Sequence, residues 1–178
     1  MVQTPRLEVR RDRVTAPGGV PIEYDWVQVP DQVRVAALVS GRILVVEQDH
    51  YLVGPMLQLP GGGVEPGEDA RTCAQRELRE ETGYHGGRWH CSGHLFPVPG
   101  LSPMRVHLWR ARDPRPGPQD LEPAEQDLRV HALTPAQAVA AIRSGRVRCA
   151  PSAVLILQVA EAAGVSPAGT RGRRAPAG

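Results

Sequence analysis

The sequence of 178 residues contains no lysine: all 21 of its basic residues are arginines, whereas alanine, glycine and proline are abundant. Such a bias is typical of a GC-rich bacterial genome and does not by itself indicate a functional preference for guanidinium groups. No stretch approaches the roughly 18 consecutive apolar residues of a transmembrane helix. Residues 1–13 are polar and lack the apolar region of a signal peptide. We therefore expect neither a membrane span nor a secretory signal.

Cysteine is also scarce. Cys73, Cys91 and Cys149 lie far apart and are odd in number, which excludes a closed disulfide framework and a CxxC metal knuckle. Proteins without disulfides are typical of reducing compartments. We therefore predict a cytoplasmic location.

The net charge is small and is concentrated at one end of the chain. The formal value is +2, but residues 165–178 carry three arginines and no acid, which leaves 18 arginines against 19 acidic residues in the rest. A near-neutral body argues against a nucleic-acid partner. The length fits one domain with a small extension. We expect an N-terminal extension over 1–30, the main domain over 31–164, and a disordered tail over 165–178, which is rich in proline, alanine, glycine and arginine.

Hydrophobic patterning predicts an α/β protein. Alternating apolar and polar residues on both sides of a turn at 16–19 indicate an antiparallel β-hairpin, and two more continuously apolar runs indicate strands buried on both faces. The expected hairpin strands are 7–14 and 21–29, the buried strands are 33–39 and 43–47, and later strands are 94–98, 105–112 and 128–133. The expected helices are 69–82, a helix after the N-cap Thr134 that ends near 144, and 152–163, with loops at 61–67 and 113–123.

The helix expected over 69–82 carries a cluster of carboxylates. Glu77, Glu80 and Glu81 are spaced three and four residues apart and therefore project from neighbouring positions. Two unit charges about 4 Å apart repel by roughly 1 kcal/mol in water and about 4 kcal/mol at an effective dielectric near 20. Either Arg76 and Arg79 relieve this repulsion on a solvated, salt-bridged face, or a hard divalent cation such as Mg²⁺ or Mn²⁺ does.

The spacing around this helix matches a longer pattern, G-x5-E-x7-R-E-U-x-E-E-x-G-U. Every fixed position is filled, and only the final aliphatic position departs, where Tyr84 stands. The matching residues are Gly62, Glu68, Arg76, Glu77, Leu78, Glu80, Glu81 and Gly83. On these residues the chain resembles the Nudix hydrolases. The resemblance implies a Nudix fold, which is an α/β/α sandwich around a mixed β-sheet, and Mg²⁺-dependent hydrolysis of a nucleoside diphosphate linked to another moiety.

The resemblance also implies roles for individual residues. Glu77, Glu80 and Glu81 correspond to metal ligands for Mg²⁺, with Mn²⁺ as a possible substitute, and Glu68 and Arg76 correspond to the pair that orients the helix. The backbone around Gly61, Gly62 and Gly63 has no Cβ atoms, so it can approach a metal or a phosphate closely and offer the Gly61 carbonyl as a ligand. Gly62 and Gly63 could also serve only as turn formers.

Over residues 5–163 the chain looks similar to the ADP-ribose pyrophosphatase branch of this family. In that branch an N-terminal hairpin builds a domain-swapped homodimer, and a marker proline stands where this chain has Pro99, fifteen residues after Tyr84. The run 121–127 resembles an acidic loop that supplies a further metal ligand or general base. Glu125 is the first candidate for that role and Glu122 the second; an ordinary exposed acidic loop is the alternative.

Two departures from this branch concern the substrate. Members often read Gln-Tyr-Arg and Glu-Leu-Pro where this chain has residues 48–51 (QDHY) and 58–60 (QLP), so an expected arginine is missing. His50, Tyr51 and Trp26 are candidates for stacking on a base, or they fill a dimer seam or the core. Arg105 either faces the pyrophosphate or caps the sheet. The run 90–94, with two histidines and a cysteine, is better explained by a surface strand than by a zinc site.

These observations predict an enzyme that hydrolyses ADP-ribose or a related NAD-derived dinucleotide to AMP and a sugar phosphate. Nucleotide sugars such as GDP-mannose, or a substrate of specialised metabolism, are the enzymatic alternatives. A non-catalytic ADP-ribose sensor is disfavoured because the carboxylates are complete and a DNA-binding domain has no room. An RNA 5′-pyrophosphohydrolase would need a basic cleft. We expect a homodimer through the hairpin, and neither a nucleic acid nor a membrane as partner.

Overall fold

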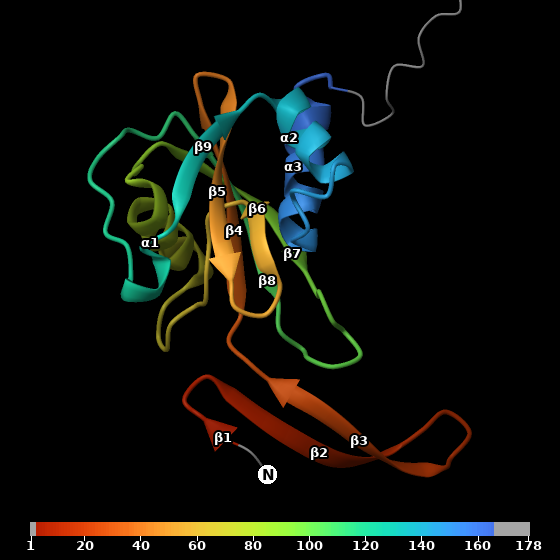
Figure 1. The fold of residues 1–178 in the computed structure, drawn as a ribbon. Coiled ribbons are helices and arrows are strands. Elements are labelled where there is room, and N and C mark those ends of the chain that lie inside the picture. Colours follow the sequence, from red (N-terminus) through yellow and green to blue (C-terminus); the bar gives the residue numbers. More distant parts are fainter. Residues whose placement is uncertain (1–2, 166–178) are drawn as a thin grey trace, which may run out of the picture.

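The computed structural model describes residues 3–165 and consists of a layered main domain with a small separate sheet at its N-terminal end (Figure 1). The predicted disordered tail lies, apart from Val165, outside the described residues. The elements in chain order are β1 (Gln3–Thr4), β2 (Leu7–Thr15), β3 (Pro21–Gln28), β4 (Gln32–Val39), β5 (Arg42–His50), β6 (Gly54–Gln58), α1 (Ala70–Thr82), β7 (Arg88–Leu95), β8 (Val106–Arg112), the 3-10 turn η1 (Pro123–Glu125), β9 (Arg129–Leu133), α2 (Pro135–Arg143) and α3 (Ala150–Ala162).

The main domain is an α/β/α sandwich. Its sheet runs β6-β5-β4-β8-β7, with β9 paired to β5, and it is mixed because β4 and β8 are parallel whereas the other pairs are antiparallel. Helix α1 covers one face, and α2 and α3 cover the other (Figure 1). The fold class predicted from the sequence is therefore confirmed.

The continuous apolar run of β4 is explained by burial on both of its faces. Val33 and Val35 pack with Leu78 of α1 on one side of the sheet. Ala36 lies on the other side, in a core with Leu155 and Ile156 of α3. A strand between two helical layers has no solvent face, so an apolar run replaces the usual alternation.

Strand β6 is absent from the sequence-based prediction, and it is the element that places the glycine loop. β4 and β5 pair only near their shared turn, at Leu38↔Ile43 and Val39↔Arg42. The chain leaving β6 enters the gap beside β4, where the Val35 amide donates to the Pro60 carbonyl and the Val33 amide donates to the Gly62 carbonyl, both at 2.9 Å. Residues 60–62 are thereby fixed beside β4, where the Gly61 amide reaches Glu81 of α1.

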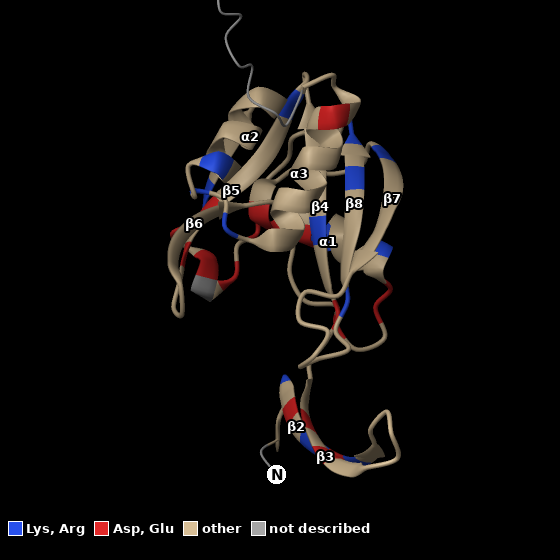
Figure 2. Ribbon diagram, turned by 90° about the vertical axis from the view of Figure 1, so that its right-hand side faces the viewer, with Lys and Arg blue, Asp and Glu red and all other residues tan. Residues whose placement is uncertain are grey.

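The N-terminal hairpin is present, and β1 extends it to a sheet of three strands, β1-β2-β3. One face carries charged residues, where Arg11 donates to Asp25 at 2.6 Å and to Glu23 at 3.1 Å. Both charge signs are visible along this hairpin in Figure 2. The opposite face carries the cross-strand pairs Val14↔Ile22, Asp12↔Tyr24 and Arg10↔Trp26. Among residues 3–165 no helix covers this sheet (Figure 1).

One predicted strand is wrong in its position. The chain forms a strand at Arg88–Leu95 instead of at 94–98, and residues 96–105 form a loop. Within residues 3–165, β7 is an edge strand that pairs with β8 alone, and its register shifts between Cys91 and His94. Polar residues are common on such an edge strand. The interpretation of 90–94 as a surface strand is confirmed, whereas Phe96 and Val98 of the predicted strand lie in the loop. Within residues 3–165 no helix is both long and apolar enough to cross a bilayer.

Candidate active site

Helix α1 begins and ends with local signals that fix the direction of its acidic face. The Asp69 carboxylate accepts hydrogen bonds from the amides of Arg71 and Thr72, at 2.8 and 3.0 Å, as an N-cap residue does. At the other end Gly83 adopts φ 75°, and its amide donates to the Arg79 carbonyl. With Leu78 buried against the sheet, the glutamates of the last two turns face the glycine loop.

Arg76 holds these carboxylates together. Its Nε and Nη2 atoms donate to both carboxylate oxygens of Glu68, each at 3.0 Å. Its Nη1 donates to Glu77 at 2.9 Å and to Glu80 at 3.0 Å, and Nη2 also reaches the Gly63 carbonyl at 3.1 Å. The Glu68–Arg76 pair thus ties the end of the loop to the helix, and one guanidinium contacts three glutamates.

Glu81 lies deeper than its neighbours. Its side chain is 2% exposed and accepts a hydrogen bond of 2.8 Å from the Gly61 amide. The Gly61 carbonyl, predicted as a metal ligand, accepts a hydrogen bond of 2.6 Å from Arg34 Nη1. The sequence analysis missed Arg34, although an arginine inside an otherwise apolar strand was a usable signal.

Burial makes two of these carboxylates hard to ionise. Desolvation raises the pKa of Glu77 to about 7, against the favourable effect of Arg76, and raises the pKa of Glu81 to about 8, against the Gly61 hydrogen bond. Desolvation also raises the pKa of Glu125, and neighbouring Glu122 and Glu80 add to that shift. The Arg76 guanidinium lowers the pKa of Glu68. Carboxylates with raised pKa values on a concave surface are typical of functional sites.

The acidic face of α1 borders a cleft of about 630 Å³. Glu77 and Glu80 line the cleft from α1, Gly62 and Gly63 line it from the loop, and Glu122 and Glu125 line it from η1 and the residue before it. The structure therefore brings the helix and the predicted acidic loop together across one space, although 46 residues separate Arg76 from Glu122 in the chain. Glu81 lies beneath this surface and is not among the lining residues.

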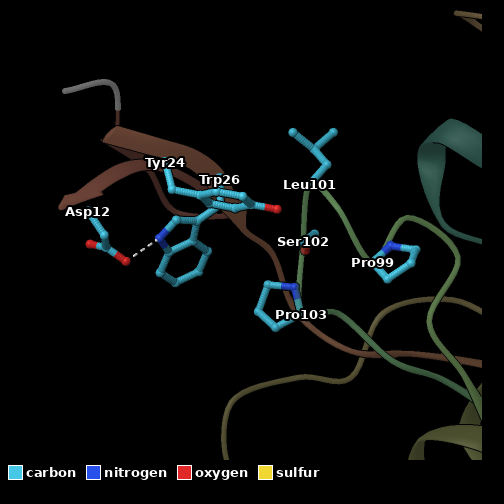
Figure 3. A pocket seen from close by; sticks show the side chains of 7 residues that line it. All are labelled: Asp12, Tyr24, Trp26, Pro99, Leu101, Ser102 and Pro103. Atoms are coloured by element: carbon cyan, nitrogen blue, oxygen red, sulfur yellow. Dashed lines mark hydrogen bonds between the residues drawn. The ribbon is translucent and has the colours of Figure 1, made fainter. Parts of the chain in front are cut away.

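The predicted base-stacking and pyrophosphate residues do not line this cleft. Trp26 lines a second cavity of about 370 Å³ between the hairpin and the loop 99–103 (Figure 3). Its Nε1 donates to Asp12 at 2.7 Å, and the Arg10 guanidinium lies 5.0 Å from its ring centre. Tyr51 is fully exposed in the β5–β6 turn, next to His50 at the end of β5. Arg105 pairs with Asp31 at 3.3 Å.

Asp31 is a second residue that the sequence analysis missed. Its carboxylate accepts from the Arg105 amide at 2.9 Å and contacts His107 Nε2 at 3.0 Å, while its carbonyl accepts from the Val64 amide at 2.8 Å. Asp31 therefore joins β8 and the glycine loop at the point where the hairpin leaves the main domain. Only the folded arrangement of these distant segments shows this role.

The residues of the cleft fit a divalent cation, although no group of three metal-ligating side chains is preassembled among residues 3–165. Buried carboxylates with raised pKa values gain from a nearby cation, and oxygen donors suit Mg²⁺. A Cβ atom at Gly62 would lie 2.4 Å from the Glu77 carboxylate, so glycine keeps this space open. Glu77 and Glu80 would hold the ion at the cleft surface, with Glu81 behind them, once Arg76 gives up part of its contacts.

A substitution at Gly62 tests whether the space between Gly62 and the Glu77 carboxylate is needed. We expect Gly62→Ala to lower activity by about tenfold or more, because its methyl group displaces the Glu77 carboxylate from its position. Thermal stability should change little, because the end of a flexible side chain can move. The measurement is the steady-state rate together with the melting temperature. Gly63→Ala is the matched control, since a Cβ atom there meets nothing within 4 Å; equal losses in both variants would contradict the assignment.

Comparison with known proteins identifies the family. The family model described as NUDIX domain matches residues 30–149. The chain is 31% identical over 153 residues to the CMP-5′-(N-acetyl-N-hydroxy-3-aminopropyl)phosphonate hydrolase of Streptomyces rubellomurinus, covering 82% of this chain and 71% of that protein. It is 34% identical over 106 residues to the ADP-ribose pyrophosphatase of Mycobacterium tuberculosis, covering 58% of this chain and 51% of the relative. This protein therefore belongs to the Nudix hydrolase family.

The fold also has a close match among solved structures. A protein described as an ADP compounds hydrolase superposes with a TM-score of 0.80 over 94% of this chain and 92% of its own, at 17% sequence identity. That likeness shows a shared fold, including the N-terminal part. Several sequence relatives are matched over only 51% to 59% of their own length.

Proposed function

We propose that this protein is a divalent-cation-dependent pyrophosphatase that hydrolyses ADP-ribose or a related NAD-derived dinucleotide to AMP and a sugar phosphate. The observation that carries the proposal is the cleft in which Glu77 and Glu80 of α1 face Glu122 and Glu125. ADP-ribose pyrophosphatases among the relatives support the choice of substrate. The lack of disulfides among the described cysteines agrees with action in the reducing cytoplasm.

The chemistry requires a water molecule to attack a phosphorus atom of an anionic diphosphate. The water oxygen forms a bond to that phosphorus, and the bridging P–O bond breaks, so that the leaving phosphate keeps the electron pair. Glu125 is our first candidate for the general base that takes the proton of this water, because its raised pKa brings proton acceptance closer to neutral pH. Glu122 is the second candidate. A bound Mg²⁺ would neutralise phosphate oxygens and lower the pKa of the water.

The glutamates of α1 and Arg76 have separate tasks in this proposal. Glu77 and Glu80 bind the cation at the cleft surface, Glu81 fixes the Gly61 amide, and the Glu68–Arg76 pair orients the helix. Four residues are candidates for contacts with the rest of the substrate, and none of them lines the acidic cleft of this protomer. They are Trp26, His50, Tyr51 and Arg105.

A substrate of specialised metabolism is the second candidate. Two relatives are described above. The one that matches more of this chain is a hydrolase of a CMP-linked phosphonate. The cleft chemistry would be the same, because that substrate also joins a nucleotide to a second moiety through a phosphorus-centred linkage. Nucleotide sugars are the third possibility.

Product analysis separates these substrates. The purified protein is incubated with Mg²⁺ and, in turn, ADP-ribose, NAD, NADH, CMP-linked compounds and nucleotide sugars, and the products are resolved by chromatography. We expect AMP and ribose 5-phosphate in equal amounts from ADP-ribose. If another compound is cleaved and ADP-ribose gives no product, the proposed reaction type is retained and ADP-ribose is rejected as the substrate. No cleavage in the whole panel would reject the proposed function.

We also propose that the hairpin joins two copies of the chain. The face that carries Val14, Ile22 and Tyr24 is covered only in part: Tyr24 donates to the Gly100 carbonyl at 2.7 Å, but Val14 and Ile22, nearer the hairpin turn, are 39% and 41% exposed. Val20 at the turn is 59% exposed. Adjacent exposed apolar side chains of this kind are typical of an interface. A second copy would supply an equivalent apolar patch in a symmetric dimer.

Charged residues on this face should separate the copies. We expect the double variant Val14→Glu and Ile22→Glu to elute with a mass near 19.3 kDa, whereas the unchanged protein has twice that mass. The two positions pair across the hairpin, so the charges would repel each other and any apolar partner. Light scattering coupled to size exclusion gives both masses. Arg13→Glu on the charged face is the control; a monomeric unchanged protein would contradict the proposal.

A further inference from the structure

The far wall of the acidic cleft comes from the base of the N-terminal hairpin. Pro5 and Arg6 of the β1–β2 turn line the cleft, as do Val29 and Pro30 of the segment that leads into β4. The turn is held in place, because Thr4 pairs with Leu7 and the Arg6 amide donates to Thr4 Oγ1 at 3.3 Å. The hairpin therefore contributes to the site of its own protomer, in addition to any role between protomers.

The charges that line the cleft are unequal. Five carboxylates border it, those of Glu65, Glu77, Glu80, Glu122 and Glu125, whereas Arg76 and Arg6 are the only cations among the described lining residues. Arg76 already donates to Glu68, Glu77, Glu80 and the Gly63 carbonyl. Arg6 differs: within residues 3–165 its guanidinium forms no ion pair, and its side chain is exposed to the cleft.

We propose that Arg6 binds the diphosphate of the substrate from the hairpin side of the cleft. This inference rests on the proposed function. In it, the Arg6 guanidinium is the group that binds the second phosphate of the substrate. The acidic side of the cleft can accept phosphate oxygens only through a bound cation. That cation would neutralise the diphosphate on one side only. A planar guanidinium with free N–H donors can contact the oxygens on the other side in a bidentate manner.

The role of Arg6 predicts an effect on binding rather than on the chemical step. We expect Arg6→Gln to raise KM for ADP-ribose about tenfold at low ionic strength and to leave kcat within about twofold, since a contact made equally in ground and transition states affects KM alone. The KM of the variant should also depend less on salt concentration, because one ionic contact is lost. Arg6→Lys, which keeps the charge, should recover most of the affinity.

Arg13→Gln is the matched control, because it removes the same charge from the same hairpin at a residue that does not line the cleft. Equal KM values for Arg6→Gln and the unchanged protein, or equal shifts in both variants, would overturn the inference. Equilibrium binding of ADP-ribose, measured by calorimetry with Ca²⁺ in place of Mg²⁺, gives a readout without turnover. An unchanged protein that binds ADP-ribose but cleaves nothing would reject the proposed function, whereas tenfold weaker binding by Arg6→Gln would still support the assignment of Arg6.

Discussion

Replacement of Glu81 by glutamine is expected to abolish hydrolysis and to stabilise the metal-free protein at pH 8. Activity should fall by at least about a hundredfold, because the carboxylate beneath the cation site is lost. Stability should rise because Glu81 is 2% exposed and its pKa is raised to about 8, so its charged form is costly in the folded state. The rise from 4.5 to about 8 is roughly 3.5 pKa units, and one unit corresponds to about 1.4 kcal/mol, which puts the gain at pH 8 on the order of 4 kcal/mol.

The sign of the pH dependence follows from the same pKa values. Glu77 and Glu81 have folded-state pKa values of about 7 and 8, above the value of 4.5 that they have when exposed. The folded protein therefore retains protons that the unfolded chain has released, and this contribution to stability is complete below pH 4.5 and is lost as pH rises through 7 and 8. The free energy of unfolding of the metal-free protein should fall over this window. In Glu81→Gln the fall should be smaller.

Urea unfolding at pH 5 and pH 8, with a chelator present, measures both effects. Glu161→Gln is the control, since Glu161 is exposed near the end of α3 and should change neither stability nor rate. A Glu81→Gln protein with most of its activity would reject Glu81 as part of the cation site. An active-site carboxylate that weakens the folded state is consistent with the general trade-off between stability and function.

Replacement of Arg76 by glutamine is expected to cost about 3 kcal/mol of stability at pH 7, because breaking a buried ion pair leaves unpaired charges. Its guanidinium, with a side chain 20% exposed, contacts Glu68, Glu77 and Glu80. Without it, three carboxylates repel each other across the loop and the helix. The loss should shrink as the pH falls below 4.5 toward the lowered pKa of Glu68, because protonated Glu68 no longer needs the Arg76 guanidinium. Chemical denaturation as a function of pH measures the effect.

Arg79→Gln is the matched control on the same helix. Arg79 contacts Glu80 at 3.4 Å, and its side chain is 54% exposed, so we expect a loss below about 0.5 kcal/mol. Arg76→Lys should lie between the two, because lysine keeps the charge but cannot contact three glutamates with one planar group. Equal stability in the Arg76 and Arg79 variants would contradict the central place of Arg76.

Local spacing predicted the part of the site that lies on one helix. Glu77, Glu80, Glu81 and Arg76 are neighbours because a helix brings residues three and four apart together, and this requires no knowledge of the rest of the fold. The fold class was predictable for a related reason: buried strands and amphipathic helices have distinct hydrophobic periods. The close approach of Gly62 to Glu77 does not follow from spacing, because the loop is fixed by hydrogen bonds to β4.

Features that depend on distant segments were not predictable from spacing. β6 is short and contains Gly54 and Pro55, so its strand pattern is weak, and its place beside β4 is a tertiary contact. Arg6 and Asp31 gain their positions only when the hairpin turns back toward the glycine loop. The positions of His50 and Tyr51, outside the acidic cleft, likewise follow from where the β5–β6 turn lies in the folded sheet.

The central claim, that the acidic cleft hydrolyses a diphosphate with the help of a divalent cation, is tested most directly by one titration. ADP-ribose is incubated with the metal-stripped protein while Mg²⁺ is added stepwise, and AMP and ribose 5-phosphate are quantified. We predict no products in the presence of a chelator, and equal, saturating yields of both products as Mg²⁺ rises. Equal rates with and without the cation, or no products at any Mg²⁺ or Mn²⁺ concentration, would contradict the account.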